Sequence, residues 1–311
     1  MEPEDIQALG PVRVLLGPTA GGKTRLSLLI GERANVEIVS VDSMQVYRGM
    51  DIGTAKVSAA ERRRVPHHMI DVVEPEEHFS AARFCEMACG AIRAIRARGR
   101  APLLVCGTPF YLKALLWGMF EGPGAHAGIR RRLTLEAAES GVEALHRRLE
   151  TMDPEAAARI DERDFKRIER ALEVYELTGR PITQQQGGFE GPPRLEARIV
   201  GLRWPRAILH ERIERRVDEM VERGLSGEVS GLRERLGPQA SQAVGYKELI
   251  SHFDGETGLE DAVELVKRNT RRLAKDQIGW FKRFPVLHWY EMRPDTDFEK
   301  LADRSMQELY I

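Results

Sequence analysis

The most constraining feature of the sequence is a glycine-rich turn between an apolar run and a helical pattern. The run Val12–Leu16 predicts a buried strand, and a helix is expected from Gly22 onward. Between them lies Gly17-Pro18-Thr19-Ala20-Gly21-Gly22-Lys23-Thr24, which has the spacing of a phosphate-binding loop. Strand, loop and helix follow one another in the order that this motif requires. The sequence therefore predicts a site for a diphosphate or triphosphate.

The chemistry of this loop follows from its residue types. Glycines let successive backbone N–H groups turn toward one anion, and the helix N-terminus adds a partial positive charge. Lys23 adds a full positive charge, and the hydroxyl of Thr24 is a candidate ligand for Mg²⁺. The motif alone does not say what is done with the bound phosphate.

Strand-like runs alternate with helical patterns, which predicts an α/β fold with a parallel, P-loop NTPase-like sheet. After Trp117 the strand signal stops and resumes only at Ala197. We therefore predict a core formed by residues 1–119 and 193–311, with an all-helical insertion at 120–192 and a mostly helical C-terminal region. The expected strands are 12–16, 37–41, 68–72, 102–106 and 198–202, and the expected helices are 22–34, 80–98, 108–117 and 205–223.

Composition places the chain among ordinary soluble globular proteins, with 311 residues, 42% apolar and 31% charged. No run approaches the length of about 20 apolar residues that a membrane span needs. The acidic N-terminus lacks the basic and apolar regions of a signal peptide. Cys85, Cys89 and Cys106 form no metal pattern and cannot all pair, which favours a reducing cytoplasm.

Basic residues are clustered, although the net charge of −1 gives no overall signal for nucleic acid. The span 261–283 holds seven Lys/Arg against three Asp/Glu. A single cluster is ordinarily a solvated helix face, but several of them in a phosphate-binding protein suggest a polyanionic partner. The other clusters are 62–64, 130–132, 166–170 and 212–216.

Polar residues directly after the strands are the next candidates, because ligands of α/β sheets lie beyond the carboxyl ends of the strands. Asp42 follows the second strand and is expected to face the same crevice as Lys23. It is a magnesium ligand, a general base or a structural cap of the next turn. Ser43 and Gln45 carry donors and acceptors suited to reading a base edge. Thr108, after the fourth strand, either donates to a leaving oxygen or caps the next helix.

Two patterns that the sequence lacks argue against one class of site and one class of protein. The paired His67 and His68 have no third ligand nearby in the sequence, so a metal site is not expected there. The run 102–106 ends in Gly107-Thr108 rather than in the magnesium-ligating Asp of a motor or switch NTPase. These patterns weigh against an ATP-driven machine and favour group transfer on a small substrate.

Together these residues resemble the tRNA dimethylallyltransferase family. The loop at 17–24 is similar to the phosphate loop of that family, and VDSMQVYRGMDIGTAK at 41–56 resembles its most distinctive block. Two departures are Cys106, where the family has Gly, and Leu273, near which the family has a bulky, often aromatic residue. Further matches are 66–68, 107–108, 167–174, 212–220, 244–248 and 270–281.

The resemblance implies transfer of a dimethylallyl group from dimethylallyl diphosphate to N6 of adenosine 37, next to the anticodon of tRNAs that read codons beginning with U. Mg²⁺ is the implied cofactor, and a cytoplasmic monomer that needs no membrane is expected. Lys23, the other residues of 17–24 and Mg²⁺ on Thr24 would hold the leaving diphosphate. Asp42 would act as the general base. Thr108 and an arginine, either Arg212 or Arg216, would also help to hold the diphosphate.

The same resemblance assigns the insertion and a basic helix at 258–284 to the anticodon stem-loop. The target base must leave its stack to be reached. Arg167 and Arg170 are the best candidates in the insertion, because they lie one helical turn apart on one face. The expected tRNA contacts are Asp42, Ser43, Met44, Gln45, Thr108, Arg130, Lys166, Arg167, Arg170, Gly245, Tyr246, Lys247, Arg271, Lys275 and Gln277.

Three alternatives stay open. An adenylate isopentenyltransferase, acting on free AMP, ADP or ATP, would share the loop and Asp42 but would have less need of the insertion and the basic helix. A small-molecule or nucleoside kinase would use the loop on ATP and would consume it. A non-enzymatic RNA-binding protein that senses a nucleotide would tolerate Asp42→Ala.

Overall fold

A computed structural model of the chain describes residues 9–118, 122–185 and 191–311. The chain divides into two compact units, one formed by Met1–Gly118 with Pro192–Ile311 and the other by Met119–Gly191. The second unit spans nearly the same residues as the helical insertion expected at 120–192. No helix in the described ranges combines the length and the apolar character needed to cross a membrane.

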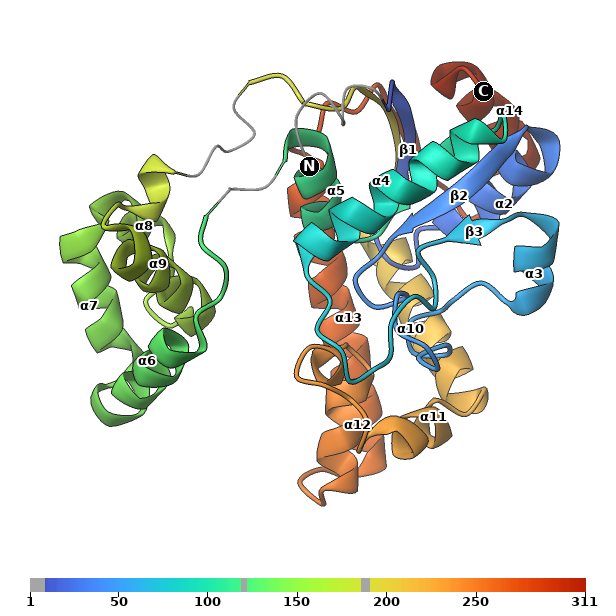
Figure 1. Cartoon of the computed structure of the whole chain (residues 1–311). Coiled ribbons are helices and arrows are strands. Elements are labelled where there is room, and N and C mark those ends of the chain that lie inside the picture. Colours follow the sequence, from blue (N-terminus) through green and yellow to red (C-terminus); the bar gives the residue numbers. More distant parts are fainter. Residues whose placement is uncertain (1–8, 119–121, 186–190) are drawn as a thin grey trace. The chain divides into compact units, whose positions relative to one another are not determined.

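The larger unit is built on a six-stranded sheet whose neighbouring strands all pair in parallel (Figure 1). The strand order is β3-β2-β4-β1-β5-β6, so the strand that leads into the phosphate loop lies in the interior of the sheet. The central strands are mostly apolar and almost wholly buried, as expected for a sheet covered on both faces. The strands are β1 Val12–Leu16, β2 Val36–Val41, β3 His67–His68, β4 Ala101–Cys106, β5 Ala197–Arg203 and β6 His288–Glu291.

Helices cover both faces of this sheet. On one face α4 (Ala81–Ala97) packs against β2, β4 and α5 (Pro109–Trp117). On the other face α2 (Lys23–Arg33) packs against α14 (Phe298–Leu309). The core beneath these two helices includes the buried side chains of Leu15, Leu26, Val200, Trp204 and Leu301.

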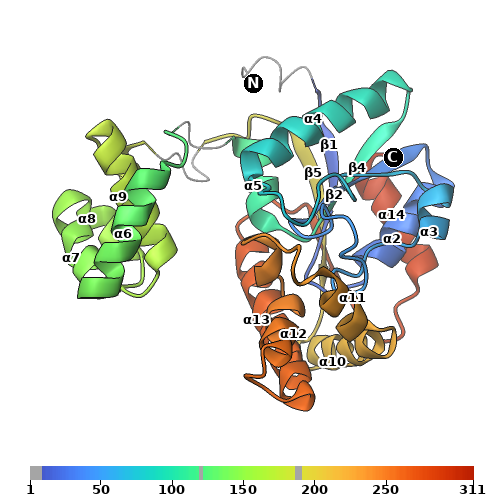
Figure 2. The same ribbon diagram turned by 60° about the horizontal axis from the view of Figure 1, so that its bottom comes forward.

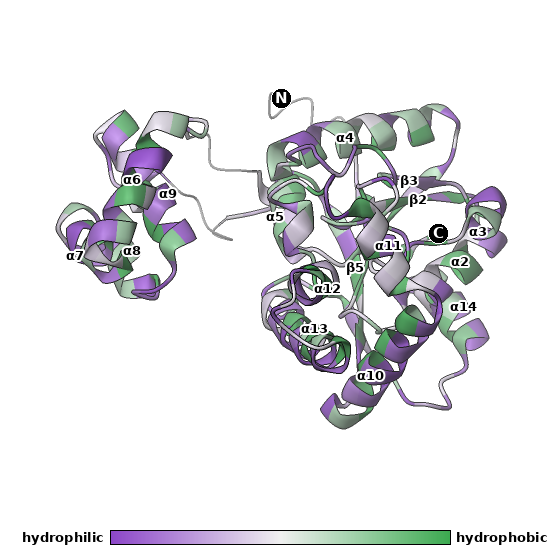
Figure 3. Cartoon of the chain, turned by 90° about the horizontal axis from the view of Figure 1, so that it is seen from below, coloured by the Kyte–Doolittle hydropathy of each residue, from purple (hydrophilic) through white to green (hydrophobic). Residues whose placement is uncertain are grey.

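A group of helices from the C-terminal third lies together at one end of the sheet (Figure 2). Hydrophilic and hydrophobic residues alternate along the two longest of them, α10 and α13, as expected for helices with one packed face (Figure 3). The members of this group are α10 Arg206–Glu222, α11 Leu225–Leu232, α12 Tyr246–Phe253 and α13 Leu259–Phe281, with the 3-10 turn η2 Ala240–Gln242. A separate short helix, α3 (Ala59–Arg64), lies beside β3.

The second unit is a small helical bundle with its own apolar core. Leu133, Leu145, Leu149 and Leu172 are fully buried in it. Asp153 is also buried, and its carboxylate accepts the backbone N–H groups of Ala156 and Thr183 at 3.0 Å each. The helices are α6 Ala127–Ser140, α7 Val142–Met152, α8 Pro154–Arg159 and α9 Phe165–Thr178, with the 3-10 turn η1 Ile182–Gln184.

Two strands differ from the prediction. The expected strand at 68–72 is wrong, because β3 contains only His67–His68. Met69 and Asp71 have φ angles of 65° and 56°, which end an extended segment. Asp71 is held in this bend by ion pairs of 2.6 Å to Lys56 and to Arg62. The sixth strand, β6, lies in a region that the sequence pattern assigned to helices.

Candidate active site

The phosphate loop has the backbone that its glycines predict. Gly22 has a φ of 94° and precedes the first residue of α2, and a Cβ at Gly22 would lie 2.9 Å from the ring of Phe298. Only glycine fits this conformation and this space. The first N–H groups of α2 have no acceptor within the helix, so they remain available to an anion.

Four side chains hold the loop from outside. The amide of Gln277 accepts the N–H of Thr19 at 2.8 Å, and the indole of Trp204 donates to the carbonyl of Gly21 at 2.9 Å. Arg212 donates to the carbonyl of Ala20 at 2.9 Å and stacks 4.2 Å from the Trp204 ring. Arg216 donates to the hydroxyl of Thr19 at 3.2 Å. Both candidate arginines therefore contact the loop.

Lys23 folds back over the loop. Its ammonium donates to the carbonyls of Gly17 and Pro18 at 2.8 and 2.9 Å. Desolvation by burial, helped by the nearby Arg216, lowers the pKa of Lys23 to about 8 against the opposing influence of Asp42. Burial also lowers the pKa of Arg216 below its usual value. An anionic ligand would stabilise the charged form of both groups.

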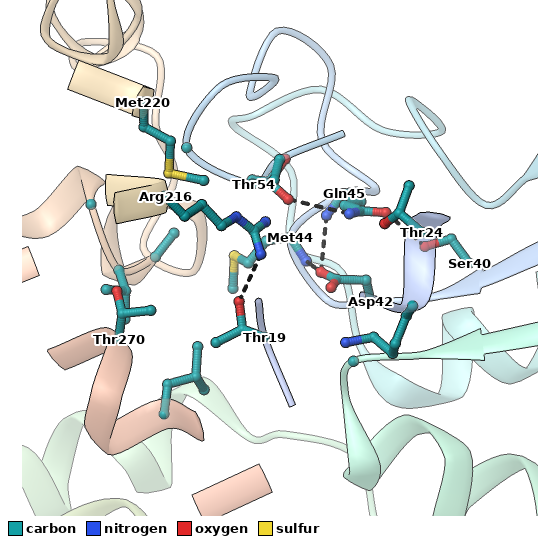
Figure 4. Close-up of a pocket in the computed structure, with 18 of the residues that line it drawn as sticks. Thr19, Thr24, Ser40, Asp42, Met44, Gln45, Thr54, Arg216, Met220 and Thr270 are labelled. Atoms are coloured by element: carbon teal, nitrogen blue, oxygen red, sulfur yellow. Dashed lines mark hydrogen bonds between the residues drawn. The ribbon is translucent and has the colours of Figure 1, made fainter. Parts of the chain in front are cut away.

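Asp42 lies in the same pocket as Lys23 and is held in one orientation (Figure 4). Its Oδ1 accepts the N–H groups of Met44 and Gln45 at 2.9 and 3.2 Å. A Cβ at Gly107 would lie 2.9 Å from Oδ2, so glycine there makes room for the carboxylate. The carboxylate thus caps its own turn through one oxygen, and among the described residues no hydrogen-bond donor is found on the other. This second oxygen can accept a hydrogen bond from a ligand.

Thr108 contacts the turn after Asp42 rather than its own helix. Its hydroxyl accepts the N–H of Ser43 at 2.9 Å and lies 3.3 Å from the Ser43 hydroxyl. Thr108 occupies the N-cap position of α5, but its side chain makes no capping hydrogen bond. The interpretation of Thr108 as a helix cap is therefore wrong.

Two cavities meet at the phosphate loop. The first, of about 170 Å³, is lined by loop residues, Asp42, Met44, Gln45, Gly245 and apolar side chains of α10, α11 and α13. The second, of about 600 Å³, is lined by seven cationic side chains and by the three carboxylates of Asp51, Glu61 and Glu219. Lys23, Thr24 and Arg216 line both cavities, whereas Arg212 lines the second. This arrangement suits a ligand with a diphosphate head and an apolar tail. The cations of the second cavity are Lys23, Lys56, Arg62, Arg212, Arg215, Arg216 and Arg223.

The donor set fits Mg²⁺ that is bound mainly through a phosphate ligand. Thr24 is exposed to both cavities at the start of α2. Within the part of the chain that the structure describes, no group of three or more His, Cys, Asp or Glu side chains could hold a metal. His68 instead contacts Glu37 at 2.6 Å, and His67 contacts the carbonyl of Val65. Mg²⁺ commonly keeps several waters and takes few protein ligands beside substrate phosphates.

Glu228 is a site residue that the sequence did not reveal. Its carboxylate accepts the backbone N–H groups of Asp51, Ile52 and Gly53 at 2.7 to 3.0 Å. It also accepts the hydroxyl of Tyr246, which is fully buried. Tyr246 was expected to contact tRNA, but here it supports the 51–53 turn that borders the first cavity. A glutamate in an amphipathic helix such as α11 carries no sequence signal for this role.

Four more of the expected tRNA contacts in the larger unit lie on α12 and α13. Lys247 and Lys275 are exposed, as the prediction requires. Arg271 is paired with Glu214 at 2.7 Å. Gln277 is buried between two loops, with 7% of its surface exposed, so it does not present its side chain to solvent.

In the insertion, Arg130 and Arg170 both bind the fully buried Glu173, at 2.8 and 2.7 Å. Burial would raise the pKa of Glu173, but hydrogen bonds from Arg130, the His126 N–H and Arg170 outweigh it and lower the pKa to about 2. Arg167 is exposed and pairs with Asp164 at 2.6 Å, and Lys166 is exposed. Three of the four basic candidates therefore already pair with a carboxylate of the same unit, two of them with the buried Glu173.

Comparison with known proteins shows the family of the chain. Residues 45–284 match the model of the IPP transferase family. The chain belongs to this family. A tRNA dimethylallyltransferase of Geobacillus thermodenitrificans is 45% identical over 93% of this chain and 92% of its own length. One of Geobacter metallireducens is 47% identical over 89% of this chain and 91% of its own length.

Solved structures of the IPP transferase family resemble the whole chain. The tRNA isopentenylpyrophosphate transferase of Bacillus halodurans is 40% identical and has a TM-score of 0.69, with 97% of both chains covered. A eukaryotic dimethylallyltransferase acting on tRNA is 26% identical and has a TM-score of 0.78, with 96% of this chain and 78% of that chain covered. The predicted α/β fold class is thereby confirmed.

Proposed function

We propose that this chain transfers a dimethylallyl group from dimethylallyl diphosphate to N6 of adenosine 37 in tRNAs that read codons beginning with U, and releases diphosphate. Relatives named tRNA dimethylallyltransferase, similar along nearly the whole chain, support the transfer to tRNA. One observation carries the mechanism: Lys23, Asp42 and Arg216 line one cavity. A cation pair and a carboxylate at one place suit departure of an anion beside removal of a proton.

The leaving diphosphate would be held by the loop. As the allylic C–O bond breaks, its electron pair moves to the diphosphate oxygen. The N–H groups at the start of α2, Lys23 and Arg216 would stabilise the charge that develops there. Thr24 would hold Mg²⁺, which would supply further neutralisation of this charge when bound.

Asp42 would accept the proton of the nucleophile. The lone pair of N6 is delocalised into the adenine ring, so this amine needs deprotonation as the new C–N bond forms. Oδ1 of Asp42 is occupied by two backbone N–H groups, and Oδ2 would take the proton from N6. Thr108 fixes the Ser43 backbone beside it. The carboxylate thus needs no rearrangement before it acts.

The test is a transfer assay with labelled dimethylallyl diphosphate, Mg²⁺ and either an unmodified anticodon stem-loop or free AMP. Label should enter the stem-loop. Asp42→Asn preserves an acceptor for Met44 and Gln45 but removes the base, so we expect its rate to fall by about 10² or more. Unchanged affinity of this variant for pyrophosphate is the control for an intact loop.

Each alternative has its own outcome in this assay. Label in AMP alone would indicate an adenylate isopentenyltransferase. Consumption of ATP added to a parallel reaction would indicate a kinase, and binding of the stem-loop with label in neither substrate would indicate a non-enzymatic RNA-binding protein. Full activity in Asp42→Asn would remove Asp42 from the mechanism. The same cavity would then need a different base.

A further inference from the structure

Gln277 occupies a position between two loops that carry different parts of the candidate chemistry. It belongs to α13 and is buried. Its side-chain oxygen accepts the N–H of Thr19 at 2.8 Å, and its side-chain nitrogen donates to the carbonyl of Gly107 at 2.7 Å. A backbone N–H only donates and a carbonyl only accepts, so the two partners dictate the orientation of the amide.

This amide bridges the point where two strands of the sheet separate. β1 and β4 remain paired as far as Leu16 and Cys106. Beyond that pair the phosphate loop and the loop after β4 leave the ladder. The Gln277 amide then joins Thr19 to Gly107 across the gap, and so replaces a ladder hydrogen bond with a side chain from a distant helix.

Each of the two loops contacts a residue of the proposed reaction. Thr19 also accepts a hydrogen bond from Arg216, on the diphosphate side. Gly107 donates to the carbonyl of Val41, the residue before Asp42, at 3.0 Å, and a Cβ at Gly107 would lie 2.9 Å from Oδ2 of Asp42. A single side chain therefore links the loop of the diphosphate site to the loop that contacts Asp42.

The placement of Gln277 on its helix separates it from the exposed basic residues. Thr270, Leu273 and Gln277 of α13 line the first cavity, at the spacing of one helical face. Arg272 and Lys275 of the same helix are exposed to solvent. α13 thus carries one face that borders the pocket and another that is open to a polyanion.

We propose that Gln277 is a positioning residue that holds the phosphate loop against the Gly107 loop, and that it does not contact tRNA. This inference rests on the proposed function, since it concerns the geometry of the same transfer. It replaces the expectation that Gln277 binds RNA. Through Gln277, the helix with the exposed basic residues is bonded directly to both catalytic loops.

Two variants of Gln277 test this role. Gln277→Met keeps the length and apolar stem but leaves the Thr19 N–H and the Gly107 carbonyl without partners. Binding of inorganic pyrophosphate with Mg²⁺, measured by calorimetry in the absence of RNA, should weaken by about tenfold or more. Affinity for the unmodified anticodon stem-loop should stay within about twofold. The matched control is Lys275→Ala on the same helix, in which the stem-loop affinity falls and pyrophosphate binding is kept.

Gln277→Glu adds a readout that general destabilisation would not give. Its carboxylate accepts from Thr19 but repels the Gly107 carbonyl, whereas the protonated acid reproduces both bonds of glutamine. Relative to wild type at each pH, pyrophosphate affinity should recover between about pH 8 and pH 5.5, because burial favours the neutral acid. The deficit of Gln277→Met should not change with pH. The titratable groups that line the pocket, Lys23, Asp42, His67 and Arg216, are common to all variants.

Hydrogen exchange tests the role of Gln277 without any ligand. In both variants the amides of 17–22 and 106–110 should exchange faster than in wild type, while those of the insertion stay unchanged. Unchanged exchange in these two loops would overturn the inference, as would a Gln277→Met protein with weakened stem-loop affinity and normal pyrophosphate affinity. Failure of the wild type to bind pyrophosphate would instead count against the proposed function, and the exchange data would still decide the role of Gln277.

Discussion

Arginines serve opposite purposes in the two units. At the phosphate loop, Arg212 and Arg216 donate to a carbonyl and a hydroxyl, which leaves their positive charge uncompensated at these contacts. In the insertion, Arg130 and Arg170 pair with the buried carboxylate of Glu173, which cancels much of their charge. The first arrangement is prepared for an anion from outside, and the second already contains its anion. A basic cluster in the sequence does not distinguish the two.

The largest effect is expected at the uncompensated charge. Arg216→Gln should lower the rate of dimethylallyl transfer by about 10² to 10³, since a preorganised cationic donor is lost where charge develops on the diphosphate. Steady-state transfer to the anticodon stem-loop measures this. Arg206→Gln, an exposed position at the start of the same helix, is the control and should retain activity. A normal rate in Arg216→Gln would mean that its charge is not used.

Loss of the paired arrangement around Glu173 should lower the stability of the insertion rather than the rate of transfer. Glu173→Leu leaves Arg130 and Arg170 without their carboxylate and the His126 N–H without its acceptor. The donors that lose this acceptor are partly exposed, so the change should cost about 1 to 3 kcal/mol. We expect hydrogen exchange within α6 and α9 to accelerate accordingly, with β1 and β4 unaffected. Glu155→Gln, on the surface of the same unit, is the control. If the exchange of α6 and α9 matches wild type, the ion pairs do not hold the bundle.

The smallest effect is expected in the pH dependence of anion binding at the phosphate loop. Lys23 has a pKa of about 8, and bound pyrophosphate favours its charged form. Binding above pH 8 must therefore take up a proton, so affinity should fall by up to about tenfold per pH unit. Below pH 8 the lysine is already charged and this dependence disappears. Calorimetry between pH 7 and 9.5 measures the slope, and Lys23→Met isolates the part that belongs to pyrophosphate itself. Equal slopes in the two proteins would show that Lys23 does not titrate on binding.

The sequence predicted the features that depend on local order. The phosphate loop, Asp42 after β2 and the helical insertion each follow from neighbouring residues and from the strand pattern. The length of β3 was overestimated because the chain bends at Met69 and Asp71, and an ion pair from Lys56 to Asp71 holds this bend. Gln277, Glu228 and Trp204 act on loops far away in the chain, and hydrogen bonds of this kind leave no periodic signal. For the same reason, the pairing of Arg130 with Glu173 was invisible.

Two of the residues that contact the phosphate loop lie far from it in the sequence and are therefore synthesised much later. The loop is made early, but Gln277, which holds Thr19, follows 258 residues later. Phe298, which packs against Gly22, comes later still. A chain growing on the ribosome therefore carries an unsupported loop for most of its translation. We expect a nascent protein to gain its anion-binding capacity late, when α13 and α14 have emerged and can close around residues made at the beginning.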